Sequence, residues 1–210
     1  MSEVALNELD GIAQKIMNAL EAKNAAREQA LAVSRKVIQH CAHTIRAAHR
    51  AEFDDAANLL AQAREAARQM SDGARAHPDL YYAGYVQDAL KEFAEASIVL
   101  ALVQGQPLPD PDALGVEYAA YLNGMGEAAG ELRRHALDLI RQGRTREAET
   151  TLQMMEDIFS VLVTVDFPDA ITGGLRRTAD MVRGVLERTR GEVTMVMKQE
   201  ELQAALKAAR

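Results

Sequence analysis

The sequence lacks several features that mark common classes of protein. It contains no Trp, and aromatic residues make up only 4% of its 210 residues. The single cysteine, Cys41, excludes an internal disulfide framework. The longest apolar stretch, at 94–103, is too short and too often interrupted to span a membrane. The first residues show no basic segment followed by an apolar one, so we expect no secretory signal, no membrane partner and a cytoplasmic protein.

Signals for β-structure are also missing. No segment alternates apolar and polar residues, and no hairpin turn motif is present. Apolar residues instead recur at spacings of three and four, and the helix formers Ala, Leu, Glu, Arg and Met dominate. Prolines and glycines divide the chain into segments. We therefore expect an all-α fold in one domain, 1–210, that forms a single bundle of six or seven helices.

The predicted helices cover residues 4–48, 53–71, 78–103, 115–141, 145–165 and 175–207. The helix predicted at 4–48 could be broken near Asn24. Pro78 suits the first turn of the helix at 78–103, and Thr145 is a candidate cap of the helix at 145–165. The segment 105–114, GQPLPDPDAL, is predicted to be a loop because three prolines lie within five positions. One such loop favours antiparallel packing of the helices that it joins. The last residues, from about 195 to 210, are expected to fray.

Two neighbouring helices carry pairs of carboxylates at one-turn spacing, Glu92 with Glu95 and Glu127 with Glu131. Residues three or four apart share a helix face, so four acids converge if the two faces meet. Repulsion of roughly 4 kcal/mol for one pair at about 4 Å would be relieved by proton uptake or by a divalent cation. All-oxygen ligands favour Mg²⁺ or Mn²⁺. An ion held in this way can activate water and stabilise charge on a phosphoryl oxygen.

The neighbours of these acids favour a buried site over a solvated helix face, which is the alternative for either pair alone. Glu95 is flanked by apolar residues, and Gly124, Gly126 and Gly130 lie around the second pair. Each glycine costs a helix about 1 kcal/mol relative to alanine. Three of them suggest a close approach by another helix or by a ligand backbone. A di-iron site is disfavoured, because it needs Glu-x-x-His on paired helices and neither pair supplies it.

Basic residues gather in two segments of this acidic chain, whose net charge is −7. That charge argues against nucleic-acid binding through total charge but not against a local basic face. In the first segment, the candidates to contact phosphates are Arg35, Lys36, Arg46 and Arg50. In the second, Arg176 and Arg177 follow a Gly-Gly pair at a predicted helix start, where backbone N–H groups can hold phosphate. The alternatives are a solvated face and a flexible helix break.

A possible zinc site is a third feature. His40 and His43 lie one turn apart beside Cys41. A structural zinc site usually needs four ligands, and no further pair is visible, so this site is disfavoured.

The segment 121–132, YLNGMGEAAGEL, resembles a stretch on a central helix of the translin and translin-associated factor X (Trax) family. The matching residues are Tyr121, Leu122, Gly124, Glu127, Gly130, Glu131 and Leu132. LKEFAEASI, 90–98, is similar to a Trax segment with two glutamates, which puts Glu92 and Glu95 at its acidic positions. VSRKVIQHCAHTIRAAHR, 33–50, is similar to the family's early basic helix and includes its His49–Arg50 pair. GLRRTADMVRGVLERTRGEV, 174–193, resembles its final helix.

The resemblance implies an all-α, translin-like fold of about seven helices, assembled into a hollow shell that usually has eight subunits. It also implies binding of single-stranded RNA or DNA. Trax-type subunits are metal-dependent endoribonucleases that use these acids, whereas translin-type subunits lack a full acidic set. The chain matches all four acidic positions, with Glu127 where the Trax pattern has Asp, so the resemblance favours a catalytic, Trax-like member. Without the long insertions of eukaryotic Trax, the chain suits a prokaryotic homo-oligomer.

We therefore expect an endoribonuclease dependent on Mg²⁺ or Mn²⁺ that cleaves single-stranded RNA inside a homo-oligomeric shell. Its metal ligands are predicted to be Glu92, Glu95, Glu127 and Glu131, one of which serves as general base. The first alternative is a non-catalytic, translin-like protein that binds single-stranded RNA or DNA. The second is an all-α nucleotide pyrophosphohydrolase, which the Glu-x-x-x-Glu spacing of the second pair disfavours because that class has Glu-x-x-Asp there.

Overall fold

The computed structural model describes the backbone of residues 3–209 and the side chains of residues 8–209. Within these residues the chain forms nine helices and no strand, as the all-α prediction requires. The six long helices are α1 (Glu3–His49), α2 (Phe53–Ala74), α4 (Gly84–Val103), α6 (Tyr118–Arg141), α7 (Thr145–Thr164) and α9 (Leu175–Ala208). The three short ones are α3 (Pro78–Tyr81), α5 (Pro111–Leu114) and α8 (Asp169–Thr172). A search of the described helices for one long and apolar enough to cross a membrane finds none.

Four local predictions need correction. First, α1 continues through Asn24, where no proline or glycine interrupts the helix. Second, the predicted helix 78–103 is divided after Tyr81, and α4 begins at Gly84. Third, the proline-rich loop contains α5, because Asp110 caps it by accepting bonds from two backbone N–H groups at 2.9 and 3.3 Å. Fourth, Thr145 does not cap α7; its hydroxyl donates to Glu200 on α9, at 2.5 Å.

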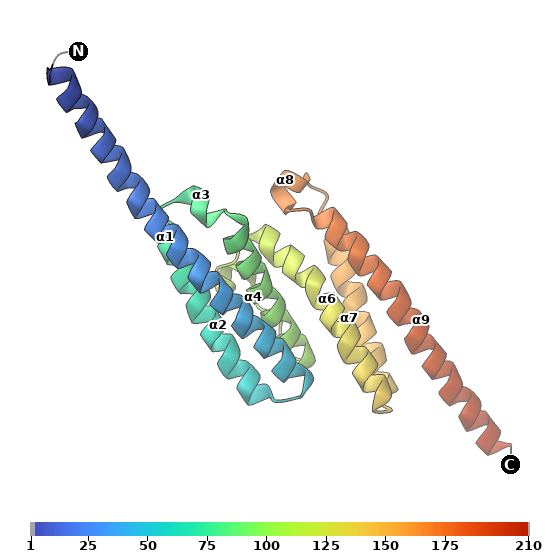
Figure 1. Cartoon of the computed structure of the whole chain (residues 1–210). Helices are drawn as coiled ribbons and strands as arrows, with labels where there is room; N and C mark the ends of the chain where they lie inside the picture. The colour runs from blue at the N-terminus through green and yellow to red at the C-terminus, as the bar shows by residue number, and fades with distance from the viewer. Residues whose placement is uncertain (1–2, 210) are drawn as a thin grey trace.

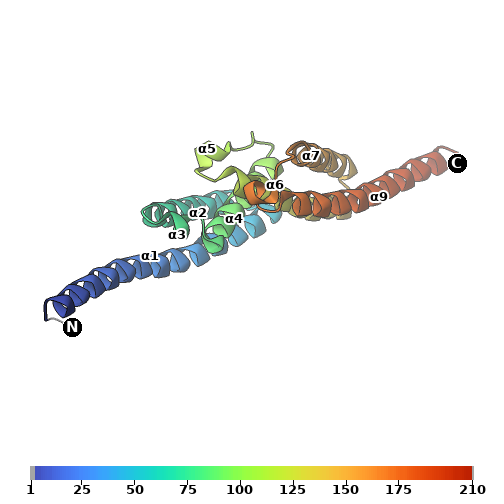
Figure 2. The ribbon, with the colours of Figure 1, turned by 90° about the horizontal axis from the view of Figure 1, so that it is seen from above.

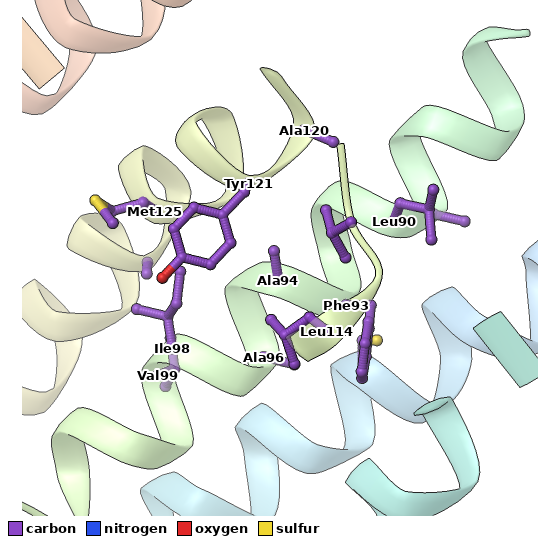
Figure 3. Close-up of a cluster of buried hydrophobic side chains, with 14 of the residues drawn as sticks. Leu90, Phe93, Ala94, Ala96, Ile98, Val99, Leu114, Ala120, Tyr121 and Met125 are labelled. Carbon is purple, nitrogen blue, oxygen red and sulfur yellow. The ribbon is translucent and has the colours of Figure 1, made fainter. Parts of the chain in front are cut away.

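The long helices form a layered bundle around the α4–α6 pair. In Figure 1, α1 and α2 lie on one side of this pair, and α7 and α9 lie on the other. Figure 2 shows from above that α1 and α9 extend in opposite directions beyond the bundle. Fully buried apolar residues of both helices form the core of the bundle, among them Phe93 and Ile98 of α4 and Leu132 of α6. Figure 3 shows Tyr121 and Met125 of α6 beside residues of α4 in this core.

The α4 and α6 helices run parallel, which corrects the expected antiparallel arrangement (Figure 1). Just before the two helices, the Tyr81 hydroxyl donates to a carboxylate oxygen of Glu117 at 2.9 Å, so both helices start at the same end of the bundle. The connection over residues 104–117 can reach roughly 45 Å, and α4 is roughly 30 Å long. The connection can therefore return along the whole of α4. Tyr121 anchors it by donating to the carbonyl of Pro109 at 2.7 Å.

Glycine allows α6 to approach the backbone of α4 very closely. A Cβ atom on Gly124 would lie 2.5 Å from the carbonyl oxygen of Lys91 and 3.1 Å from the backbone nitrogen of Glu95. Gly126 faces α9 instead, where a Cβ atom would lie 2.2 Å from the Thr178 methyl. Gly130 has no neighbour within 4 Å of such an atom. The predicted close approach by another helix is therefore present at two of the three glycines.

Replacing Gly124 by alanine should destabilise the fold, because the added methyl group meets the rigid backbone of α4. We expect Gly124→Ala to cost about 1–3 kcal/mol of unfolding free energy, the usual cost of overpacking. Gly130→Ala on the same helix is the matched control and should gain up to about 1 kcal/mol from helix propensity. Urea unfolding monitored by circular dichroism measures both. Equal stability of the two variants would contradict the close packing of α4 and α6.

Candidate metal centre and nucleic-acid interface

Three of the four predicted acids come together between α4 and α6. One carboxylate oxygen from each of Glu92, Glu95 and Glu127 lies within 4.8 Å of the others. Glu95 is buried, with 8% of its surface exposed, while the side chains of Glu92 and Glu127 are 30% and 33% exposed. The group thus has a buried inner member and two members that solvent can reach. Close packing at Gly124 produces this arrangement, because it sets α6 directly against residues 91–95 of α4.

A lysine that the sequence prediction did not include also belongs to this site. The Nζ atom of Lys91 lies 2.6 Å from Oε1 of Glu127 and 4.0 Å from Oε1 of Glu92. Its side chain is 22% exposed. Lys91 stands next to Glu92 in the sequence, and that adjacency to a predicted acid was the available signal.

The electrostatics show that one ammonium group does not balance the three carboxylates. Burial, together with the nearby charges of Glu92, Glu127 and Glu131, raises the pKa of Glu95 to about 8. Burial also raises the pKa of Glu92, with Glu127 adding to the effect. An acid whose pKa lies near neutrality holds a proton that a cation could replace.

Glu131, the fourth predicted acid, has a different partner. Its Oε2 atom lies 2.6 Å from Nε2 of His49, at the end of α1. This hydrogen bond lowers the pKa of Glu131, so the carboxylate is ionised at neutral pH. The His49 side chain is only 2% exposed, and its Nδ1 atom has no hydrogen-bond partner. The sequence prediction gave His49 no role in the site, although it lies in a segment similar to the family's basic helix.

Other candidate metal ligands are not gathered into a site. Among the described residues, the geometry required for a metal ion is met only by Glu92, Glu95 and Glu127. His40 and His43 do not form such a group with Cys41, which is buried and whose pKa is raised by burial. The disfavoured zinc site is therefore absent from the part of the chain that the structure describes.

The basic candidates form two separate surfaces. On α1, Arg35 and Arg46 lie within about 20° of each other around the helix axis, and Lys36 lies at the edge of the same exposed face. The exposed Arg50 directly follows the helix. Arg50 already pairs with Glu52 at 2.6 Å. The exposed Arg176 and Arg177 lie at the start of α9, a helix on the other side of the α4–α6 pair from α1 (Figure 1). One copy of the chain does not bring the two sets together.

A groove of about 500 Å³ lies beside His49, the partner of Glu131. The ends of α1, α4 and α6 and the first turns of α7 form its walls. Its polar lining includes His49, Arg50, His135 and Arg144. Because His49 also contacts Glu131, this residue connects the groove to the acidic group.

The buried carboxyl of Glu95 should make metal-free protein less stable as pH rises. Its pKa is about 8 in the folded chain against an ordinary 4.5, so its contribution to stability is complete below about pH 4.5 and is lost as pH rises through about 8. Glu95→Gln should therefore be more stable than the wild type, by a margin that grows between those values. The margin reaches roughly a few kcal/mol, since one pKa unit corresponds to about 1.4 kcal/mol. Urea unfolding with a chelator at several pH values measures it.

The control for this series is Glu149→Gln, which changes an exposed glutamate of α7. Its unfolding free energy should differ from that of the wild type by the same amount at every pH. If the difference in unfolding free energy between Glu95→Gln and the wild type stayed constant across the same pH range, the raised pKa of Glu95 would be contradicted.

Solved structures similar to this chain point to one family. No protein-family model matches the chain. The uncharacterized protein MJ0175 of Methanocaldococcus jannaschii is 28% identical over 209 residues, covering 97% of this chain and 89% of that protein. The structure of an AfC3PO–duplex RNA complex matches with a TM-score of 0.83 and 32% identity, over 89% of this chain and 97% of that one. A crystal structure of AfC3PO matches with a TM-score of 0.82 and 32% identity, at the same coverage.

A further solved structure, apo-NeC3PO, has a TM-score of 0.75 but 20% identity, over 90% of this chain and 96% of that one. It therefore supports the fold alone. The C3PO proteins are translin- and Trax-like, and AfC3PO is matched over nearly its whole length at 32% identity. This agrees with the resemblance of the two acidic segments and of the basic helix. The chain belongs to the translin/Trax family, as a Trax-like member.

Proposed function

We propose that this protein binds RNA and cleaves it as a metal-dependent endoribonuclease. The observation that carries the proposal is the convergence of Glu92, Glu95 and Glu127, with carboxylate oxygens within 4.8 Å of one another. RNA is the proposed substrate because a relative 32% identical to this chain was solved with duplex RNA. For cleavage we propose single-stranded RNA, the substrate that the Trax-like sequence implies.

The residues of the site fit a hard divalent cation such as Mg²⁺ or Mn²⁺. All three candidate ligands are carboxylates, which such ions prefer. Two oxygens on one Mg²⁺ lie at most about 4.2 Å apart, so oxygens within 4.8 Å need only small side-chain movements. The raised pKa of Glu95 indicates that the group is short of positive charge. A bound divalent cation would supply an activated water and charge stabilisation at the phosphate.

The fourth acid is suited to a different task. Glu131 is ionised and is held by the bond from His49, so its carboxylate can accept the proton that an attacking water loses. The buried ring of His49 fixes the orientation of Glu131. We therefore assign Glu92, Glu95 and Glu127 to metal binding, and Glu131 to the role of general base.

The groove beside His49 gives an RNA strand a route to these acids. Arg50 lines the groove and directly follows α1, whose basic face carries the other candidates. A strand that follows this face, with Arg35, Lys36 and Arg46 near its phosphates, would enter the groove beside His49, the partner of Glu131. We propose that Arg176 and Arg177 contact RNA from another copy of the chain, since α9 lies across the α4–α6 pair from α1 (Figure 1).

Assembly into a homo-oligomeric shell, with eight subunits as the family resemblance implies, is part of the proposal. The projecting part of α1 exposes the apolar residues Leu9, Ile12, Ile16 and Leu20 at helical spacing. More than half of each of these residues is exposed. Contiguous exposed apolar surface of this kind favours association with another chain. Light scattering, which gives the mass in solution, tests this proposal.

Cleavage of a labelled single-stranded RNA in Mg²⁺ or Mn²⁺ should stop on addition of a chelator. Glu127→Ala should lose both metal binding and cleavage, whereas Glu131→Gln should keep metal binding and cleave about 100-fold more slowly or worse, as for loss of a general base. Glu149→Ala is the control and should cleave normally. Duplex RNA, single-stranded DNA and a nucleoside triphosphate serve as comparison substrates. Undiminished cleavage by Glu127→Ala would contradict the assignment, and binding of RNA without turnover would support the non-catalytic alternative.

The basic face of α1 should determine how strongly RNA binding depends on salt. Replacing both Arg35 and Lys36 with alanine should weaken binding and lower the slope of log K against log salt by about 1–2, because up to two phosphate contacts are lost. Arg68→Ala, which removes an exposed arginine paired with Glu65 on α2, is the control. Fluorescence anisotropy at several salt concentrations measures both. An unchanged slope would show that RNA follows another surface.

A further inference from the structure

Lys91 occupies a position in the acidic group that a metal ion would also need. Its ammonium group lies 2.6 Å from Oε1 of Glu127 and 4.0 Å from Oε1 of Glu92. These two carboxylates are the more exposed members of the three-acid group. The amino group therefore already neutralises part of the charge that would attract a divalent cation.

Only the side chain of Lys91 is free to move. Its backbone carbonyl oxygen packs against α6 so closely that a Cβ atom on Gly124 would lie only 2.5 Å from it. The packing of α6 therefore holds this part of α4 in place. The side chain is 22% exposed and ends in a charge on a flexible four-carbon stem. It can withdraw towards solvent without any change in the packing of the two helices.

A divalent cation and the Lys91 ammonium group compete for the same carboxylate. An oxygen of Glu127 that binds Mg²⁺ or Mn²⁺ would hold the ion at about 2.1 Å, close to an ammonium group bonded to that carboxylate. Two positive groups at this separation repel strongly in a half-buried site. The ion and the Lys91–Glu127 bond therefore do not coexist in the observed geometry.

We infer that Lys91 is an internal counter-ion that holds the acidic group together before metal arrives and leaves Glu127 when a divalent cation binds. The inference rests on the proposed metal centre and deepens it. The net free energy of metal binding is then the free energy gained by coordinating the cation minus the free energy needed to break the Lys91–Glu127 bond. Lys91 lowers that affinity and sets the metal concentration at which the site fills.

Titration of the full-length protein with Mn²⁺, followed by calorimetry, tests this inference. Lys91→Met removes the competing charge and should bind Mn²⁺ at least about tenfold more tightly than the wild type, a gain of about 1.4 kcal/mol. Lys91→Arg keeps the charge and can hold a carboxylate through two hydrogen bonds, so it should bind Mn²⁺ as weakly as the wild type or more weakly. Lys198→Met, which removes a lysine paired with Glu201 on exposed α9, should leave the affinity unchanged.

Thermal unfolding provides a second measurement on the same proteins. In chelator, Lys91→Met should unfold at a lower temperature than the wild type, because its carboxylates have lost their counter-ion. In saturating Mn²⁺ the difference should disappear. If Lys91→Met does not fold, Lys91→Gln takes its place, with the same expected direction.

The outcomes separate this inference from the proposed function. If the wild type binds Mn²⁺ and Lys91→Met binds it equally or more weakly, the role of Lys91 is overturned. The proposed metal centre is then unaffected. Absence of Mn²⁺ binding by every variant, including the wild type, would overturn both.

Discussion

The contact between Gly124 and the backbone of α4 is the constraint on which the candidate site depends. Because residue 124 has no side chain, the carbonyl of Lys91 and the backbone nitrogen of Glu95 lie directly against α6. The same contact sets Glu127, one turn further along α6, beside Glu92 and Glu95 of α4. A wider spacing between the helices would leave these carboxylates on separate surfaces, without the mutual repulsion that calls for a cation.

Converging acids in a folded core need compensation, and the chain supplies part of it. Lys91 bonds to Glu127, and His49 bonds to Glu131. Glu95 has no such partner, and its pKa rises to about 8. Two of the four acids therefore have a basic partner, while the most buried one lacks a counter-charge. This partial compensation is what a site that binds and releases a cation requires.

Much of this arrangement could be predicted from the sequence, because it depends on local spacing. The all-α fold follows from the apolar period, and Glu92 and Glu95 share a face because they are three residues apart. Glycines in the middle of a helix indicated a close approach, which the structure has at Gly124. The similarity of these segments to Trax agrees with the fold of the solved C3PO structures.

What could not be predicted depends on contacts between distant segments. The direction of α6 relative to α4 follows from the path of the connection, whose length permits either arrangement. His49 reaches Glu131 from 82 residues away, so no local pattern indicated that contact. Lys91 was adjacent to a predicted acid, but its direction towards Glu127 depends on how α6 packs. Spacing also placed Glu131 with the other acids, whereas the structure gives it a separate partner.

The presence of a metal ion between α4 and α6 is the central claim, and anomalous diffraction from crystals soaked in Mn²⁺ tests it most directly. We predict one strong anomalous peak per chain, coordinated by Glu92, Glu95 and Glu127, with the Lys91 side chain withdrawn from Glu127. A peak at other residues, or no peak at a Mn²⁺ concentration that supports cleavage, would contradict the metal centre.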